Sequence, residues 1–175
     1  RERWCLWLKG ISPSVYRGIK PISDAINKVK EFRASSTRTQ TQKFASTPML
    51  FGETRQPQSE YLIVPLVNTE KRVYVPMDFF TADIVPTHQL GVIENATLYH
   101  FGVLQSIVHM AWMRYVCGRQ EMRTRYSVEI VYNNFPWPTP NDTQIQKIVK
   151  TAKAILEARK KYSDWNPFDL YSHLM

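Results

Sequence analysis

Hydrophobic and polar residues recur along the chain in patterns that predict helices near both ends and strands between them. Pro21 suits the first turn of a helix, and the apolar residues after it recur at helical spacing: Ile22, Ala25, Ile26, Val29 and Phe32. We therefore predict a basic amphipathic helix over residues 21–34. The small polar residues at 34–42 predict an exposed loop.

The middle of the chain is rich in residues that favour strands. Residues 60–67 and 72–77 are two such runs, and residues 68–71 between them have the composition of a turn, which predicts a hairpin. Residues 90–94 are a further strand candidate. Residues 126–132 alternate in a way that predicts another strand.

Two more helices are predicted in the second half of the chain. Residues 97–117 are apolar on most faces of a helix, so we expect a buried helix that ends at Gly118, with Trp112 in a structural role; its main stripe is Phe101, Leu104, Val108, Ala111 and Tyr115. Thr139 as N-cap and Pro140 at the first helical position predict a helix that runs to about Lys161.

These elements predict an α+β fold. Its expected parts are a small mixed or antiparallel sheet, a buried central helix, a basic N-terminal helix and a C-terminal helical extension. The 175 residues, 43% of them hydrophobic, suffice for one domain with a core, and no apolar run approaches the ~18 residues of a membrane span. Because the chain opens with Arg1 and lacks a signal-peptide pattern, we expect it to be an internal piece of a longer protein.

Charge and cysteine content narrow the setting of the protein. With 23 Lys and Arg against 15 Asp and Glu, the net charge is +8, which favours nucleic acid as the partner. Cys5 and Cys117 are too few for a disulfide framework, so we expect buried thiols in a reducing compartment, the cytoplasm.

Two stretches hold the whole charge excess. Residues 14–43 contain seven bases and two acids, and residues 114–125 contain four arginines and one acid. For the first stretch, a solvated helix face is the favoured interpretation. The second is harder to explain by solubility alone, since the planar fork of arginine suits guanine edges and phosphates.

The sequence offers no candidate catalytic or metal-binding residues. The four histidines have neither zinc-ligand spacing nor a neighbouring cysteine pair, and His100 and His109 fall in the apolar helix, where core packing is expected. The six glycines form no phosphate-binding loop. We therefore expect this chain to be non-catalytic by itself.

Five blocks of sequence, in order, resemble the C-terminal part of the MmeI-like enzymes. The blocks are Ser59–Pro65, Glu70–Pro76, His109–Arg114, Gly118–Arg119 and Tyr132–Pro138. These type IIL restriction-modification proteins are single chains that join a nuclease, an adenine-N6 methyltransferase and a target-recognition domain. The resemblance implies a DNA target-recognition domain over residues 1–138 and the start of a C-terminal helical domain over residues 139–175.

The resemblance also implies partners and a cofactor. The partners would be double-stranded DNA and the upstream methyltransferase domain of the same chain. The parent protein would be an adenine-specific DNA methyltransferase that also carries a nuclease. Its cofactor, S-adenosylmethionine, would bind outside this piece. The alternative is a non-catalytic protein-interaction module with a basic surface. An RNA-binding fragment is a third reading, but the aromatic residues lie in apolar runs.

In this family the stretch after the Gly-Arg pair reads base edges, which implies that Glu121, Arg123 and Arg125 do so here. Spacing of two in an extended segment would place all three on one face. Arginine can donate to guanine and glutamate can accept from cytosine, whereas the alternative is a surface ion pair on a strand edge. Further contacts to DNA backbone or bases are expected from Lys71, Arg72, His88, Gln89, Arg119, Arg33 and Arg38.

Overall fold

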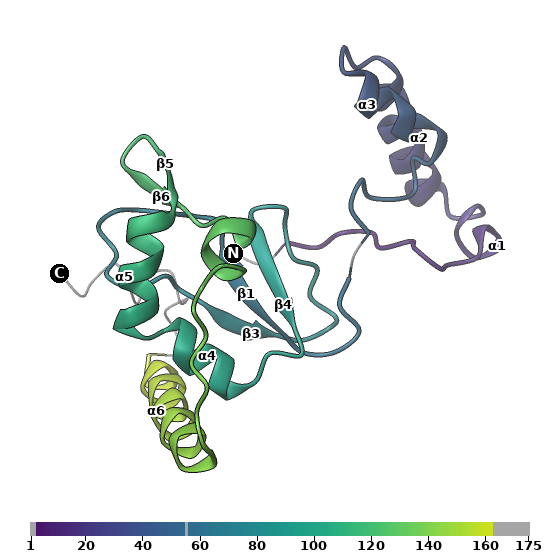
Figure 1. Cartoon of the computed structure of the whole chain (residues 1–175). Helices are drawn as coiled ribbons and strands as arrows, with labels where there is room; N and C mark the ends of the chain where they lie inside the picture. The colour runs from purple at the N-terminus through teal and green to yellow at the C-terminus, as the bar shows by residue number, and fades with distance from the viewer. Residues whose placement is uncertain (1–2, 55, 163–175) are drawn as a thin grey trace. The chain divides into compact units, whose positions relative to one another are not determined.

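The computed structural model describes residues 3–54 and 56–162 of the chain. It divides into two compact units, Arg1–Arg55 and Gln56–Met175 (Figure 1). The first unit is helical, and the second combines two small sheets with helices. This is the α+β class that the sequence predicts.

The helices of the first unit are α1 (Pro13–Tyr16), α2 (Lys20–Ala34), α3 (Thr39–Lys43) and the 3₁₀ turn η1 (Phe44–Ser46). The predicted basic helix is confirmed and begins one residue earlier. The predicted loop at 34–42 is wrong in part, because its last residues form α3. Arg33 holds this turn of the chain: its guanidinium donates to the carbonyls of Phe44, Thr47 and Leu50 at 3.0, 3.0 and 2.8 Å.

The first sheet forms the centre of the second unit. Its strands are β1 (Tyr61–Pro65), β3 (Asp78–Phe80) and β4 (Leu90–Glu94), in the antiparallel order β3-β1-β4. All five residues of β1 are buried, as expected for a central strand covered on both faces. The prediction of a strand at residues 90–94 is confirmed.

The second sheet follows directly from the first, because β2 begins two residues after the end of β1. Its strands are β2 (Val67–Asn68), β5 (Gly118–Gln120) and β6 (Arg123–Arg125), in the antiparallel order β2-β6-β5. Leu66 lies between β1 and β2 and bonds to both sides, because its N–H donates to Gln89 at 2.9 Å and its carbonyl accepts from Tyr126 at 2.8 Å. One continuous segment therefore joins the two sheets.

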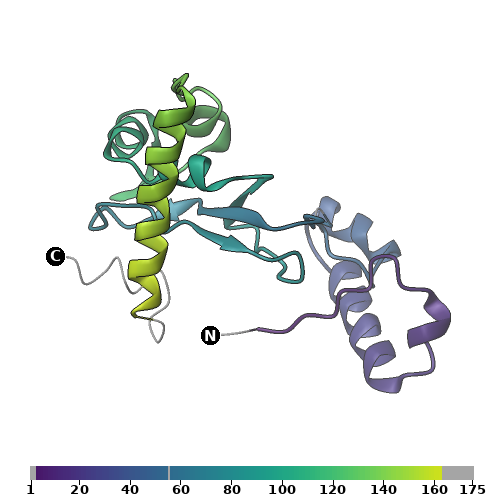
Figure 2. The same ribbon diagram turned by 90° about the horizontal axis from the view of Figure 1, so that it is seen from below.

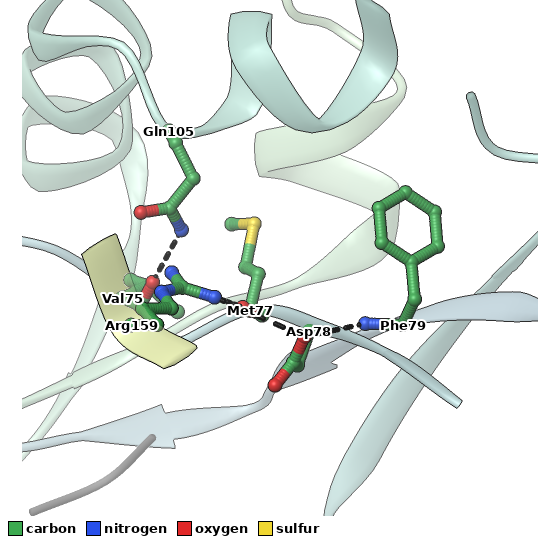
Figure 3. Close-up of polar contacts among 6 residues, drawn as sticks. All are labelled: Val75, Met77, Asp78, Phe79, Gln105 and Arg159. Carbon is green, nitrogen blue, oxygen red and sulfur yellow. Dashed lines mark hydrogen bonds and ion pairs between the residues drawn. The ribbon is translucent and has the colours of Figure 1, made fainter. Parts of the chain in front are cut away.

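The predicted hairpin between residues 60–67 and 72–77 is wrong. The strand that pairs with β1 begins only at Asp78, and residues 72–77 are irregular. Side chains bond to the backbone of this segment instead. Gln105 donates to the Val75 carbonyl at 2.6 Å (Figure 3). The sulfur of Met110 accepts from the Val75 N–H at 3.4 Å. Residues 75–77 are thus buried without pairing to another strand, and Val73 is exposed.

The predicted helix over residues 97–117 is broken into α4 (Leu98–Leu104) and α5 (Ile107–Val116). Ser106 interrupts it, because its hydroxyl caps α5 by accepting from the His109 N–H at 3.2 Å. Phe101 and Leu104 are buried as expected. The rest of the predicted stripe is exposed on α5, at Val108, Ala111 and Tyr115.

The predicted strand at 126–132 is also wrong. Strand β6 ends at Arg125, before this stretch, and Val128–Tyr132 form the π-helical turn η2. The side chain of Trp112 stabilises this turn by donating to the Val131 carbonyl at 2.9 Å. Trp112 thus has the structural contact that we expect, although it is half-buried rather than enclosed.

The last described helix, α6 (Asp142–Lys160), crosses one face of the second unit (Figure 2). Its N-cap is Asn141, which forms a capping box with Gln144, so the helix begins later than Thr139 predicts. Near its other end, Arg159 donates to the Met77 carbonyl at 2.7 Å and lies 3.9 Å from Asp78 (Figure 3). Burial raises the pKa of Asp78, although the Phe79 N–H and Arg159 oppose this shift.

The predicted domain boundary at 138/139 falls inside the second unit, where α6 packs against α4. That division stays a prediction.

The prediction of buried thiols is wrong for Cys5, which is exposed, and Cys117 is half-buried. Within residues 3–54 and 56–162, no helix is both long and apolar enough to cross a bilayer, and no three acidic, histidine or cysteine side chains are grouped as metal ligands. His173 lies outside the described residues.

Close contact between α4 and α6 depends on Gly102. A Cβ atom there would lie 2.6 Å from Cγ2 of Ile148 and 3.3 Å from Cβ of Ala152. We expect Gly102→Ala to lower the free energy of unfolding by about 1–3 kcal/mol, measured by urea denaturation. Gly118→Ala is the control, because no atom lies within 4 Å of a Cβ there. A Gly102→Ala protein as stable as wild type would contradict this packing.

The core also contains a buried polar pair. His109 Nε2 lies 2.9 Å from the Tyr126 hydroxyl, and both residues are buried. Burial lowers the pKa of His109 from 6.5 to about 4 and raises that of Tyr126. His109 is therefore neutral at pH 7, and its Nδ1 has no hydrogen-bond partner among the residues described.

This shift predicts acid sensitivity. Between the pKa of about 6.5 in the unfolded chain and about 4 in the folded one, only the unfolded chain binds the proton, so stability falls as pH falls through this window. We expect a loss of roughly 3 kcal/mol from this residue. Unfolding of wild type and His109→Gln should be compared from pH 7 to pH 4. Equal pH dependence in the two proteins would argue against a neutral buried His109.

Candidate nucleic-acid interface

The arginine-rich stretch identified in the sequence forms a β-hairpin that projects from the second unit (Figure 1). Its strands β5 and β6 are joined by a two-residue turn, Glu121–Met122. Met122 at the tip is 70% exposed. With β2 along β6, the hairpin forms a narrow three-stranded ribbon. Because β2 pairs only with Arg125 and Thr124, the end of the ribbon at Gln120 and Arg123 is two-stranded, and a two-stranded ribbon fits a major groove.

The register of the ribbon divides its residues between two faces. Residues directly opposite one another on antiparallel strands share a face. Asn68, Thr124 and Arg119 are such a row, and Val67, Arg125 and Gly118 form the next row on the opposite face. Arg123, two residues before Arg125 on β6, shares the second face.

The prediction that Arg123 and Arg125 lie on one exposed face is confirmed. Both are exposed, and Thr124 between them is buried. Glu121 is different: it lies in the turn with a φ of +58°, so the expected extended segment with all three side chains on one face is wrong for this residue. The turn still places Glu121 next to the Gln120–Arg123 pair.

The structure brings a second predicted segment to this ribbon. His88 and Gln89 are exposed in the turn before β4, and the Gln89 carbonyl accepts from Leu66, the residue that precedes β2. Since Val67 is paired with Arg125, the turn lies beside the base of the arginine face. Sequence alone places these segments far apart.

The remaining predicted residues of the second unit lie elsewhere. Arg72 and Arg119 line one pocket, on the face of the ribbon opposite Arg123 and Arg125. Lys71 is exposed in the turn between Glu70 and Arg72, which both line that pocket. Sequence reasoning missed Asn68 and Thr124, which have no local signal, and assigned no role to Arg114, although it belongs to the arginine-rich stretch.

Arg33 and Arg38 belong to the first unit. Arg38 is exposed and precedes α3. Arg33 is half-buried, with its guanidinium on three carbonyls and 5.9 Å from the centre of the Phe44 ring. That arginine therefore has a structural task in its own unit, and DNA contact by either residue stays a prediction.

Comparison with known proteins gives consistent matches. Residues 1–139 match the family described as MmeI, target recognition domain. DNA methyltransferase A of Bacillus subtilis (strain 168) is 33% identical over 159 residues, which are 91% of this chain and 18% of that protein. A solved structure of the type IIL restriction-modification enzyme MmeI in complex with DNA matches 97% of this chain with a TM-score of 0.93 and 40% identity. The chain spans 23% of that enzyme.

The turn of the ribbon yields a test of strain. A positive φ costs a residue with a side chain roughly 1 kcal/mol, and glycine avoids this cost. We expect Glu121→Gly to keep or raise the melting temperature. Gln120→Gly on β5, where φ is not positive, should instead lower stability by about 0.5–1 kcal/mol. A clear loss of stability in Glu121→Gly would show that the carboxylate supports the fold.

Proposed function

Because the chain belongs to the MmeI target recognition domain family, we propose that it reads the base sequence of double-stranded DNA for an adenine-specific DNA methyltransferase. The observation that carries this proposal is the projecting ribbon with Arg123 and Arg125 on one exposed face. The two-stranded end of the ribbon can enter the major groove, where an arginine can donate two hydrogen bonds to O6 and N7 of a guanine.

Glu121 would complete the readout from the tip of the ribbon. Its carboxylate can accept from the N4 amino group of cytosine, while Arg123 donates to the guanine of the same base pair. The positive φ of Glu121 supports this role, since a strained residue persists where its side chain is needed. Turn and strand together can thus specify one base pair.

Other exposed residues would extend the contact. His88 and Gln89 lie beside the base of the arginine face, where they can reach neighbouring bases or phosphates. Lys71 and Arg38 are exposed and can add phosphate contacts. Such contacts would hold the ribbon in one register on the duplex.

The chemistry would belong to other parts of the parent protein. The curated relative is named a DNA methyltransferase. We propose that the parent protein acts in the cytoplasm and transfers a methyl group from S-adenosylmethionine to N6 of adenine in DNA. The recognition domain would hold the site in register while the upstream methyltransferase domain takes one adenine out of the stack. This chain would contribute positioning and no catalytic residue.

The proposal predicts a change of specificity in the full-length enzyme. Glu121→Lys with Arg123→Asp exchanges acceptor and donor, so the enzyme should methylate sites in which one base pair is inverted and the others are unchanged. Each bidentate contact discriminates by roughly 1–3 kcal/mol, which suffices to define a position. Mapping modified adenines before and after the double substitution measures the result.

Two outcomes would separate this proposal from its alternatives. An unaltered recognition sequence with normal activity would make the two residues a surface ion pair, worth about 0–1 kcal/mol. A full-length protein that neither binds nor methylates DNA would favour the protein-interaction module. Arg119→Gln, on the opposite face of the ribbon, is the matched control and should leave the recognition sequence unchanged.

A further inference from the structure

A pocket of about 250 Å³ lies on the face of the ribbon that carries Asn68, Thr124 and Arg119, opposite Arg123 and Arg125. The row Asn68, Thr124 and Arg119 contributes one wall. The segment that includes Glu70 and Arg72, together with Arg114 of α5, contributes the rest of the polar lining. The base-reading role of the ribbon does not use this pocket.

The charges of the pocket select an anion. Three guanidinium groups, from Arg72, Arg114 and Arg119, line it with one carboxylate, from Glu70. Arg114 is fixed in place because it donates to the Val73 carbonyl. The Arg119 side chain is exposed and has no hydrogen-bonding or ionic partner in the described part of the chain. A neutral ligand would leave this positive excess uncompensated.

Asn68 adds a second, independent sign of an incomplete site. It is 3% exposed, and its Nδ2 donates to the Pro65 carbonyl at 2.9 Å, which identifies Oδ1 as the acceptor. This Oδ1 is buried without a hydrogen-bond partner among the residues described. Buried acceptors are normally satisfied, and a water that donates both to Oδ1 and to an anion would satisfy this one.

We propose that this pocket binds one backbone phosphate of the recognised DNA. The inference rests on the proposed function, and it adds a division of labour between the faces of the ribbon. Arg123 and Arg125 would face bases while Arg119 and Arg114 hold a phosphate through charge-assisted hydrogen bonds. A phosphate held on one face fixes which way the ribbon lies on the duplex.

The experiment couples one protein charge to one phosphate. Duplexes that carry the recognition sequence are made with a neutral methylphosphonate at one position at a time, and their binding to the full-length enzyme is measured. At one position the neutral group should weaken wild type roughly tenfold and leave Arg119→Gln unaffected. Arg119→Gln should also reduce the slope of log affinity against log salt by about 0.9 without changing the methylated sequence.

Two matched variants control for charge and folding. Lys153→Gln removes one charge from an exposed position of α6 and should keep the coupled phosphate. Arg119→Lys keeps the charge and should retain most of the salt slope. If wild type binds DNA but no phosphate is coupled to Arg119, the pocket proposal is overturned and the proposed function stands. If wild type does not bind DNA at all, both fail.

Discussion

Leu66 joins the two sheets of the second unit through its own backbone. Its N–H donates to the carbonyl of Gln89, just before β4, and its carbonyl accepts from the N–H of Tyr126, just after β6. Neither sheet can therefore shift without breaking one of these bonds. The buried strand β1 thereby fixes the direction in which the ribbon leaves the core. The proposed readout of base edges would depend on this direction, because an error of about 1 Å at the tip would misplace every donor.

Local signals in the sequence predict the elements whose stability is local. The helix at Lys20–Ala34 and helix α6 both follow from apolar spacing, although α6 is capped by Asn141 and not by the predicted Thr139. Elements shaped by distant side chains are predicted wrongly. Residues 72–77 have the composition of a strand, but the side chain of Gln105 bonds to the Val75 carbonyl in place of a neighbouring strand. Similarly, Trp112 stabilises a helical turn where alternation predicts a strand.

Some features of the candidate interface can likewise be predicted from the sequence and others cannot. The arginine cluster is visible in the sequence, and its spacing predicts that Arg123 and Arg125 share a face. The positive φ of Glu121 is not visible, because glycine or asparagine is the usual residue there. Nor can sequence show that Asn68 lies in one row with Thr124 and Arg119, since strand pairing over such a separation depends on the whole fold.

Exposed and buried side chains alternate along β6, and this alternation has an evolutionary consequence. Buried Thr124 and its partner Asn68 hold the ribbon to the protein, whereas the outward side chains of Arg123 and Arg125 pack against little. Stability and outward chemistry are thus encoded at neighbouring positions that can mutate independently. A lineage can exchange the outward residues with little loss of folding, so such a scaffold can diversify rapidly under selection for new targets.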